Sequence, residues 1–334
     1  MTARRYFILI IAAALFFIYG CSDLKKRSDY SNTPIPARFL HLEKDIQAFK
    51  KNVGHNKYDS LKIIYGDFLD IYTQSVLGLG KSGDSSLHQN LSTFLNDTSV
   101  QLILSNIETQ FVSTNDIDAE IRHGLQGLKQ NLPDLITPVV VYLMSGLRYN
   151  VVLSDSALGI GLDLYLGPES NIYERAGVPH FRRDNSNPKR IPYDALRGWL
   201  MSEIEISDFK LIDHIIQYGK TMAILEELYP DVNEEYLAGY TSAEWKWCLE
   251  NEALIWATLI ESKTLFSKQG EDVRKYTADG PFTTGFPRES PSRLAVFIGW
   301  QIMRSYLDRN NVTWSELLVL QGPEILNNSN YKPE

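Results

Sequence analysis

The sequence predicts an α+β fold, a mostly helical single domain with a small β-sheet. Apolar residues recur every three or four positions through 39–131 and again after Tyr193, the period of helices with one buried face. Between these parts, after Pro138, the chain is rich in β-branched and alternating residues bounded by Gly, Ser and Pro. No repeat or low-complexity tract divides the chain from Phe39 to Leu326, so one domain is expected.

The central stretch contains the predicted strands, and most of the well-defined helices follow it. The strands are expected at 139–143, 149–153 and 158–166. The later helices are expected at 196–205, 208–228, 242–266 and 292–308. At the last of these, Ser290 is expected to be the N-cap and Pro291 to take the first helical position.

The first 21 residues have the plan of a signal peptide that ends in a lipid attachment site. Arg4 and Arg5 precede an apolar run over 7–19, which is too short to cross about 30 Å of hydrocarbon because a spanning helix needs about 20 residues. Ile18-Tyr19-Gly20-Cys21 then resembles the bacterial lipobox, in which the cysteine is acylated and becomes the new N-terminus. We therefore expect a lipoprotein signal peptide at 1–20, a polar tether at 21–37 and the folded domain at 38–334.

The net charge limits the expected partners, and the cysteine count limits the expected sources of stability. The formal net charge of −8 becomes −10 when Arg4 and Arg5 leave with the signal peptide. An acidic body does not attract polyanions, so nucleic acid is excluded as an expected partner. Cys248 is the only other cysteine, so the mature chain has no pair for an internal disulfide and its stability must come from its core. The expected membrane contact is the lipid on Cys21.

The helix expected at 208–228 carries a histidine in a context typical of zinc peptidases. These enzymes carry H-E-x-x-H on a helix, where two histidines bind the metal and the glutamate is the general base. Here Ile215 and Tyr218 follow His214 at the positions of the glutamate and the second histidine. Neutral tyrosine is a poor zinc ligand at pH 7, and isoleucine cannot accept a proton. The usual zinc hydrolase is therefore ruled against, and no metal or other cofactor is expected.

The order of segments in the second half resembles the gliding-motility lipoprotein GldB family. Besides the lipobox, the resemblance rests on Leu162-Asp163-Leu164-Tyr165-Leu166-Gly167, His214 to Lys220, Gly239 to Glu244, Glu250-Asn251-Glu252, Gly280-Pro281-Phe282, Glu289 to Arg293 and Gly299-Trp300-Gln301-Ile302. It implies a cell-envelope lipoprotein linked to gliding motility and to the associated secretion apparatus, with no known reaction. The family fold is similar to the zincin-like peptidases, so 38–334 is expected to be a GldB-like α+β domain with H-x-x-x-Y in place of H-E-x-x-H.

Three functions remain open. The first is a non-catalytic lipoprotein on the outer membrane, facing the periplasm, that binds other envelope proteins of the gliding and secretion machinery or a wall component through a cleft beside the sheet. The candidate cleft residues are Asp163, Tyr165, Arg197, His214, Tyr218, Glu250, Glu252, Glu289 and Arg293. The second is a peptidase-like hydrolase with a metal-dependent or rearranged site. The third is a structural subunit that binds through its helical first half.

Overall fold

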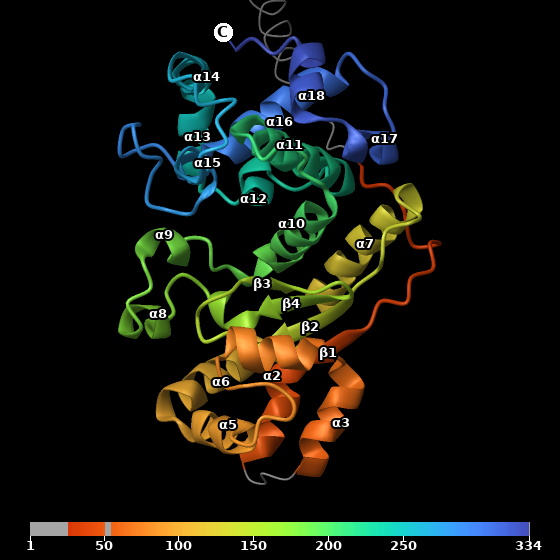
Figure 1. The fold of residues 1–334 in the computed structure, drawn as a ribbon, viewed down its shortest axis with the longest axis vertical. Helices are drawn as coiled ribbons and strands as arrows, with labels where there is room; N and C mark the ends of the chain where they lie inside the picture. The colour runs from red at the N-terminus through yellow and green to blue at the C-terminus, as the bar shows by residue number, and fades with distance from the viewer. Residues whose placement is uncertain (1–25, 51–54, 334) are drawn as a thin grey trace, which may run out of the picture.

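The computed structural model describes residues 26–50 and 55–333, and it places a small sheet between layers of helices (Figure 1). The predicted signal peptide at 1–20 and Cys21 lie outside the described residues. The mostly helical α+β architecture with a small sheet is confirmed. No helix among the described residues is both long enough and apolar enough to cross a membrane.

The sheet has four strands among the described residues, in the order β1-β2-β4-β3. They are β1 (Phe39–His41), β2 (Val139–Leu143), β3 (Val151–Leu153) and β4 (Ala157–Gly161). β2 pairs in parallel with both β1 and β4, whereas β3 pairs with β4 antiparallel. The helical period read at Phe39 was wrong, because Phe39 pairs with Val140 and this long-range pairing overrides the local pattern.

One layer of short helices covers one face of the sheet. It comprises α2 (Leu42–Asp45), η1 (Ile46–Lys50), α3 (His55–Tyr65), α4 (Phe68–Asp70), η2 (Ile71–Val76), α5 (Leu87–Asn96) and α6 (Thr98–Gln110). The buried Tyr72 joins this layer to the sheet, because its hydroxyl donates to the Met144 carbonyl beyond β2 at 3.1 Å. The layer forms one hydrophobic core with the rest of the domain.

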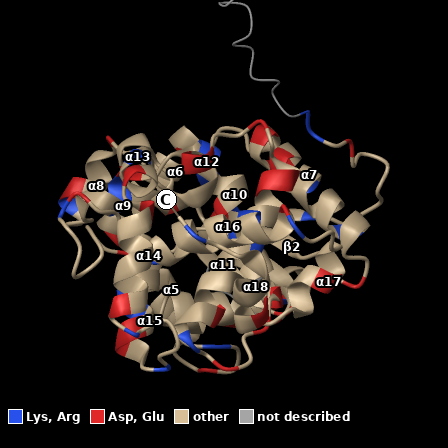
Figure 2. Cartoon of the chain, turned by 90° about the horizontal axis from the view of Figure 1, so that it is seen from above, with Lys and Arg blue, Asp and Glu red and all other residues tan. Residues whose placement is uncertain are grey.

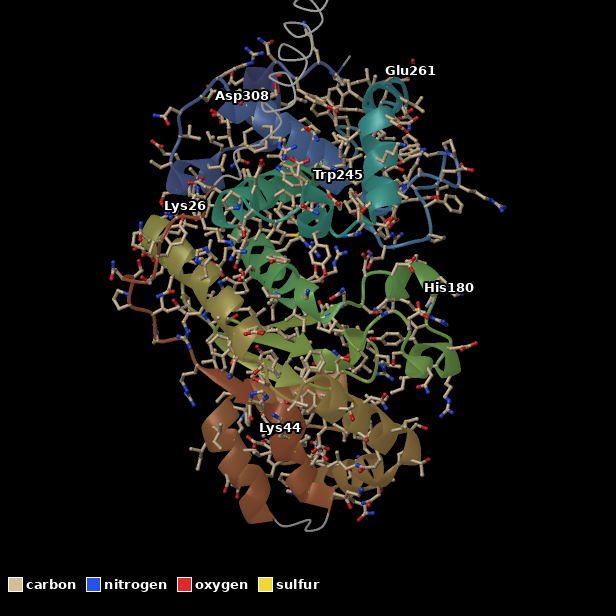
Figure 3. All side chains as sticks on the ribbon, turned by 180° about the vertical axis from the view of Figure 1, so that it is seen from behind. Lys26, Lys44, His180, Trp245, Glu261 and Asp308 are labelled. Atoms are coloured by element: carbon tan, nitrogen blue, oxygen red, sulfur yellow. The ribbon has the colours of Figure 1, made fainter. Side chains whose placement is uncertain are left out.

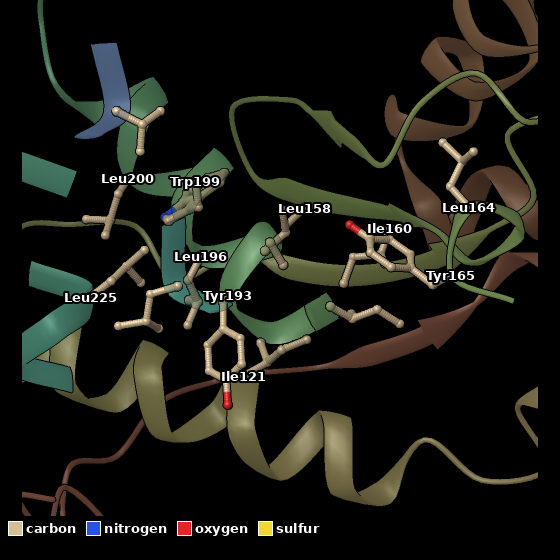
Figure 4. Close-up of a cluster of buried hydrophobic side chains, with 14 of the residues drawn as sticks. Ile121, Leu158, Ile160, Leu164, Tyr165, Tyr193, Leu196, Trp199, Leu200 and Leu225 are labelled. Carbon is tan, nitrogen blue, oxygen red and sulfur yellow. The ribbon is translucent and has the colours of Figure 1, made fainter. Parts of the chain in front are cut away.

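Two helices cover the opposite face, and a third layer lies beyond them (Figure 1). The covering helices are α7 (Asn115–Asn131) and α10 (Ile191–Glu203). In Figure 4, side chains of α10, including Leu196 and Trp199, lie between Leu158 of β4 and Leu225 of the next layer. All four of these side chains are buried, so α10 connects the sheet to the third layer through continuous apolar packing.

The third layer contains the helices of the C-terminal third. They are α11 (Leu211–Leu228), α12 (Glu234–Ala238), α13 (Ser242–Glu250), α14 (Glu252–Glu261), α15 (Gly270–Thr277), α16 (Leu294–Leu307), α17 (Trp314–Val319) and α18 (Gly322–Ser329). Between the sheet and α10 the chain forms η3 (Leu162–Leu164), α8 (Asn171–Arg175), α9 (His180–Arg183) and η4 (Pro188–Arg190) at one side. Trp245, labelled in Figure 3, packs on Phe297 and Trp300 with ring centroids 5.3 and 5.5 Å apart.

Three predicted elements differ from the structure for local reasons. Residues 162–164 form a 3-10 turn rather than a strand, because the Asp163 carboxylate accepts from the backbone of the loop after β2. The helix expected at 242–266 is divided at Asn251, whose side chain donates to the Trp247 carbonyl at 2.8 Å. Ser290 is not a helix cap, because α16 begins only after Arg293, whose φ is +58°.

The described part of the predicted tether packs on the body. Tyr30 is buried in the core, and Gln126 of α7 donates to the Thr33 carbonyl at 3.0 Å. Arg27 pairs with Glu120 of α7 at 2.7 Å and with Asp231. Arg27, Tyr30 and Thr33 therefore contact the folded body, and the bounds of the tether at 21–37 remain a prediction.

Candidate functional site

The predicted metal-motif helix, α11, is packed backbone to backbone on α16. A Cβ atom at Gly219 would lie 2.2 Å from the Gly299 carbonyl oxygen, and one at Gly299 would lie 2.0 Å from the Ile215 carbonyl oxygen. Only glycine fits such an approach. Ile215 is itself fully buried, so the position of the missing general base is occupied by a core side chain.

His214 and Tyr218 occupy the half-buried face of α11. Burial lowers the pKa of His214, and its ring lies 6.5 Å from the ring of Phe209. Burial raises the pKa of Tyr218, against the positive charges of Arg293 and Arg197. The phenol is therefore neutral at pH 7. In residues 26–50 and 55–333, no three His, Cys, Asp or Glu side chains gather in an arrangement that could hold a metal ion.

Beside this helix lies a cavity of about 260 Å³. Its walls come from α9, α10, the glycine after α12, the start of α13 and the segments before α16. His180, labelled in Figure 3, marks the position of α9, which contributes Phe181 and Arg182 to the cavity. Val151 and Met201 add apolar surface. The cavity therefore combines segments that are distant in sequence.

Four arginines line the cavity: Arg182, Arg190, Arg197 and Arg293. Arg197 donates to the Leu237 carbonyl at 3.0 Å and to the Asp194 carboxylate three residues before it on α10. Arg293 donates to the Gly239 carbonyl at 2.7 Å. Its Nε lies 3.0 Å from Asp279 Oδ1 as an ion pair, although the geometry of this contact is not that of a hydrogen bond. These contacts fix both guanidinium groups in place.

Arg190 is the most confined of the four, with 3% of its surface exposed. Its Nη1 donates to Asn185 at 2.6 Å and its Nη2 to the Tyr236 carbonyl at 3.2 Å, while its Nε has no hydrogen-bond partner among the described residues. Burial lowers the pKa of Arg190; Asp194 opposes this shift, and the neighbouring arginines add to it. The Arg190 guanidinium therefore carries its positive charge in surroundings that solvate it incompletely.

Gly239 allows two of these arginines to come close together. Its φ is +80°, and a Cβ atom there would lie 3.0 Å from Arg190 Nη2 and 3.2 Å from Arg293 Nη2. Glycine suits this position for two reasons, because it adopts a left-handed backbone without strain and because it has no Cβ atom that would contact the arginines. Gly239 is also the residue that ends α12, so the end of this helix and the placement of the arginines are coupled.

The structure brings some of the predicted cleft residues to the cavity. Arg197 and Arg293 line it. Tyr165 is buried and donates to Asp194, another lining residue, at 3.0 Å. Tyr218 lies close enough to Arg293 and Arg197 for their charges to affect its pKa. These four predicted residues therefore belong to one electrostatic neighbourhood.

Five other predicted residues have different surroundings. Asp163 is fully buried and holds the loop after β2 through Ser145, whose backbone N–H donates to it at 2.8 Å; burial raises its pKa. His214, Glu250, Glu252 and Glu289 do not line the cavity. Glu250 and Glu289 are exposed, and Glu252 accepts from the Tyr331 hydroxyl at 2.7 Å.

Sequence reasoning did not select the other charged lining residues. Arg182, Arg190 and Asp194 all precede the helix predicted at 196–205, and the two arginines have basic neighbours in sequence, as ordinary surface residues often do. The spacing of Asp194 and Arg197 was a usable signal, since residues three apart share a helix face. Nothing local to Glu244 or Asp279 indicated that either lies beside these arginines.

The surface of the described protein carries many acidic side chains. Acidic residues mark α7, α12, α15 and α17 in Figure 2, in keeping with the net charge of −8.

The family model of the gliding motility protein GldB matches residues 23–333. The chain belongs to the GldB family. Membership associates it with gliding motility and with lipoproteins of the cell envelope, and it confirms the resemblance drawn from the ordered segments.

Neither a search of curated proteins nor a search of solved structures found a match to this GldB-family chain. Three of the segments that suggested the family contribute lining residues to the cavity, namely Gly239 and Glu244, Gly280, and Arg293. The zincin-like relationship remains a prediction. The candidate functional site is therefore the arginine-lined cavity next to α11.

Proposed function

We propose that this GldB-family protein is a non-catalytic binding component of the motility and secretion machinery, held on the outer membrane by lipid on Cys21 and facing the periplasm. In this proposal the cavity between α9, α10 and α16 is where another envelope protein docks. The observation that supports this proposal most strongly is the set of four arginines around one cavity, two of which have a buried Nε that makes no hydrogen bond among the described residues.

The packing of α11 supports binding rather than catalysis. The residue after His214 is a buried isoleucine whose backbone contacts Gly299, and the residue four positions on is a neutral phenol. Neither position offers the base or second imidazole of the usual zinc mechanism. The proposal therefore assigns this helix to packing against α16.

Photo-crosslinking in cells tests where the partner docks. A photoreactive residue replacing Met201, which lines the cavity, should form a covalent adduct with another envelope protein. Replacing Val112, which is 85% exposed in the N-terminal helical part, gives the matched control and should form none. Adducts at Val112 with none at Met201 would instead support binding through the helical first half.

Metal analysis of the purified mature protein separates binding from the hydrolase alternative. The proposal predicts no stoichiometric zinc and no peptide cleavage that responds to a chelator. Stoichiometric zinc that is lost in His214→Ala would contradict the non-catalytic assignment and favour a rearranged metal site.

A further inference from the structure

The arginine cavity has an excess of positive charge that the described protein does not neutralise. Among its described lining residues, four arginines face three carboxylates, those of Asp194, Glu244 and Asp279. One positive charge is therefore left over. A single negative charge would balance the site, whereas a phosphate dianion would reverse its sign.

Two of the three carboxylates are already engaged in holding the fold. Asp194 accepts from Arg197 and from the Tyr165 hydroxyl. Glu244 accepts from the backbone N–H of Thr241 at 2.8 Å in the capping box of α13. Asp279 is different, because its side chain is 65% exposed and its ion pair with Arg293 lacks hydrogen-bond geometry. A ligand can therefore accept a hydrogen bond from Arg293 Nε without disturbing the carboxylates of Asp194 and Glu244.

The donors that remain suit a carboxylate group. Arg190 Nε is unpaired among the described residues, and the side chain is 3% exposed. Arg293 Nε is the second buried donor without a hydrogen bond. Guanidinium groups match the planar geometry of a carboxylate and form short, charge-assisted hydrogen bonds with it. Buried donors of this kind are costly to leave unpaired, so a ligand that satisfies them gains affinity.

The size and the walls of the cavity fit a residue-sized group. Its volume of about 260 Å³ is several times the roughly 30 Å³ that one water molecule occupies in the liquid. Phe181, Val151 and Met201 give it apolar surface beside the arginines. An organic carboxylate offers both a charged end and carbon atoms for that surface, whereas inorganic phosphate offers only the charge.

We propose that this cavity binds one carboxylate group of a partner polypeptide, either a chain end or an acidic side chain. The inference rests on the proposed docking function and gives it a chemical specificity. Arg190 and Arg293 donate to the carboxylate, and Arg182 at the rim adds attraction. The partner inserts one acidic residue or its C-terminus between α9 and the segment before α16.

Titration of the purified mature protein with four small probes tests this chemistry. The probes are N-acetylglycine for a chain end, N-acetyl-aspartate N-methylamide for a side chain, inorganic phosphate, and the neutral N-acetylglycine N-methylamide. The Nε–H resonances of arginine, assigned through single Arg→Lys variants, report on binding at fixed ionic strength. At least one carboxylate probe should shift the Arg190 resonance saturably and bind at least tenfold more tightly than phosphate, with no saturable shift from the neutral probe. The relative strength of the two carboxylate probes shows which source the site prefers.

Variants locate the site and keep the test independent of folding. Arg190→Gln should lower the affinity for the more tightly bound carboxylate probe by at least tenfold, as expected for the loss of a charge-assisted hydrogen bond. Because Arg190 also holds Asn185 and Tyr236, Arg182→Gln serves as a milder variant and should weaken binding by about threefold. Arg288→Gln, which removes an exposed charge outside the cavity, should leave the affinity unchanged. Phosphate binding as tight as carboxylate binding, or an unmoved Arg190 resonance, would overturn the inference.

The two proposals fail in different experiments. Crosslinking of a protein at Met201 without carboxylate binding would refute the carboxylate inference and leave docking intact. Carboxylate binding without any crosslinked partner at Met201 would refute docking and leave the anion site intact.

Discussion

Glycine permits a close approach both at the crossing of α11 and α16 and at the neighbouring arginine cavity, but the groups that come together differ. At the crossing, Gly219 and Gly299 remove side chains so that two helices contact through their backbones. At the cavity, Gly239 removes a side chain so that two guanidinium groups can approach. The crossing leaves no space between the two helices, whereas the cavity leaves a space lined by two buried Nε donors that make no hydrogen bond among the described residues.

The difference separates a region that packs the fold from a region that is open to a ligand. The α11 segment looks catalytic in sequence, yet its contacts are those of a core. The cavity residues look like scattered surface charges in sequence, yet they enclose a polar space with buried donors. Four predictions test this contrast, from the largest expected effect to the smallest.

Gly299→Ala should give the largest loss of stability, because its new methyl group meets the Ile215 carbonyl 2.0 Å away and the helices must move apart. We expect the free energy of unfolding to fall by about 3 kcal/mol or more. Urea denaturation of the mature protein measures it. Gly270→Ala, whose Cβ would meet nothing within 4 Å, is the control and should change stability by less than about 0.5 kcal/mol. Equal effects would show that the crossing is not closely packed.

Gly239→Ala should cost about 2 kcal/mol, partly from the left-handed backbone and partly from contact with Arg190 and Arg293. Gly177→Ala isolates the backbone part, since Gly177 has a φ of +68° and open space around it. Denaturation of both variants gives the difference. The Arg190 Nε–H resonance should shift only in Gly239→Ala, and an unshifted resonance would argue against the close approach.

Lys220→Met tests a buried cation that belongs to the packed region. Lys220 is 2% exposed, donates to the carbonyls of Leu318 and Leu320 at 3.0 and 2.6 Å, and has its pKa lowered by burial from 10.5 to about 8. Between about pH 8 and 10.5 the unfolded chain binds more protons at this residue than the folded chain, so wild-type stability rises with pH relative to the variant. The slope should reach at most about 1.4 kcal/mol per pH unit.

Below about pH 8 both states carry the proton on Lys220, so the stability difference between wild type and variant should be flat. Denaturation at pH 7, 8, 9 and 10 measures it. A constant difference across the whole range would mean that the lysine keeps its ordinary pKa in the folded protein.

Glu250→Gln and Glu289→Gln should have the smallest effects. Both side chains are exposed and outside the cavity, and the contact of Glu250 with Lys246 is a surface pair at 3.7 Å. Each change should alter the free energy of unfolding by less than about 0.5 kcal/mol. Neither should reduce crosslinking at Met201. A large loss of crosslinking in either variant would widen the binding surface beyond the cavity.

The sequence predicted the parts of the fold that depend on local pattern. Strand β2 and the long amphipathic helices follow from periodicity and β-branched runs. It did not predict β1, since Phe39 becomes a strand only by pairing with Val140. Nor did it predict the turn at Asp163, which depends on the distant loop at Ser145.

The candidate site shows the same limit. Arg197 and Arg293 were predicted and line the cavity, but Arg190, which has the most confined guanidinium, was not selected because its burial depends on Gly239 and Tyr236 from another segment. Exposed Glu289 was selected for its place in a family-like segment. Charge in a sequence does not indicate burial, and burial is what distinguishes a binding donor from a solvated surface group.

Comparison of partner capture by His214→Ala and Arg197→Gln tests the central claim most directly. Each variant is expressed with the photoreactive residue at Met201, and the adduct is normalised to folded protein. The account predicts that Arg197→Gln loses at least tenfold of the adduct while His214→Ala stays within twofold of the parent. Loss of the adduct in His214→Ala with retention in Arg197→Gln would contradict docking at the cavity and would place the functional site on α11 instead.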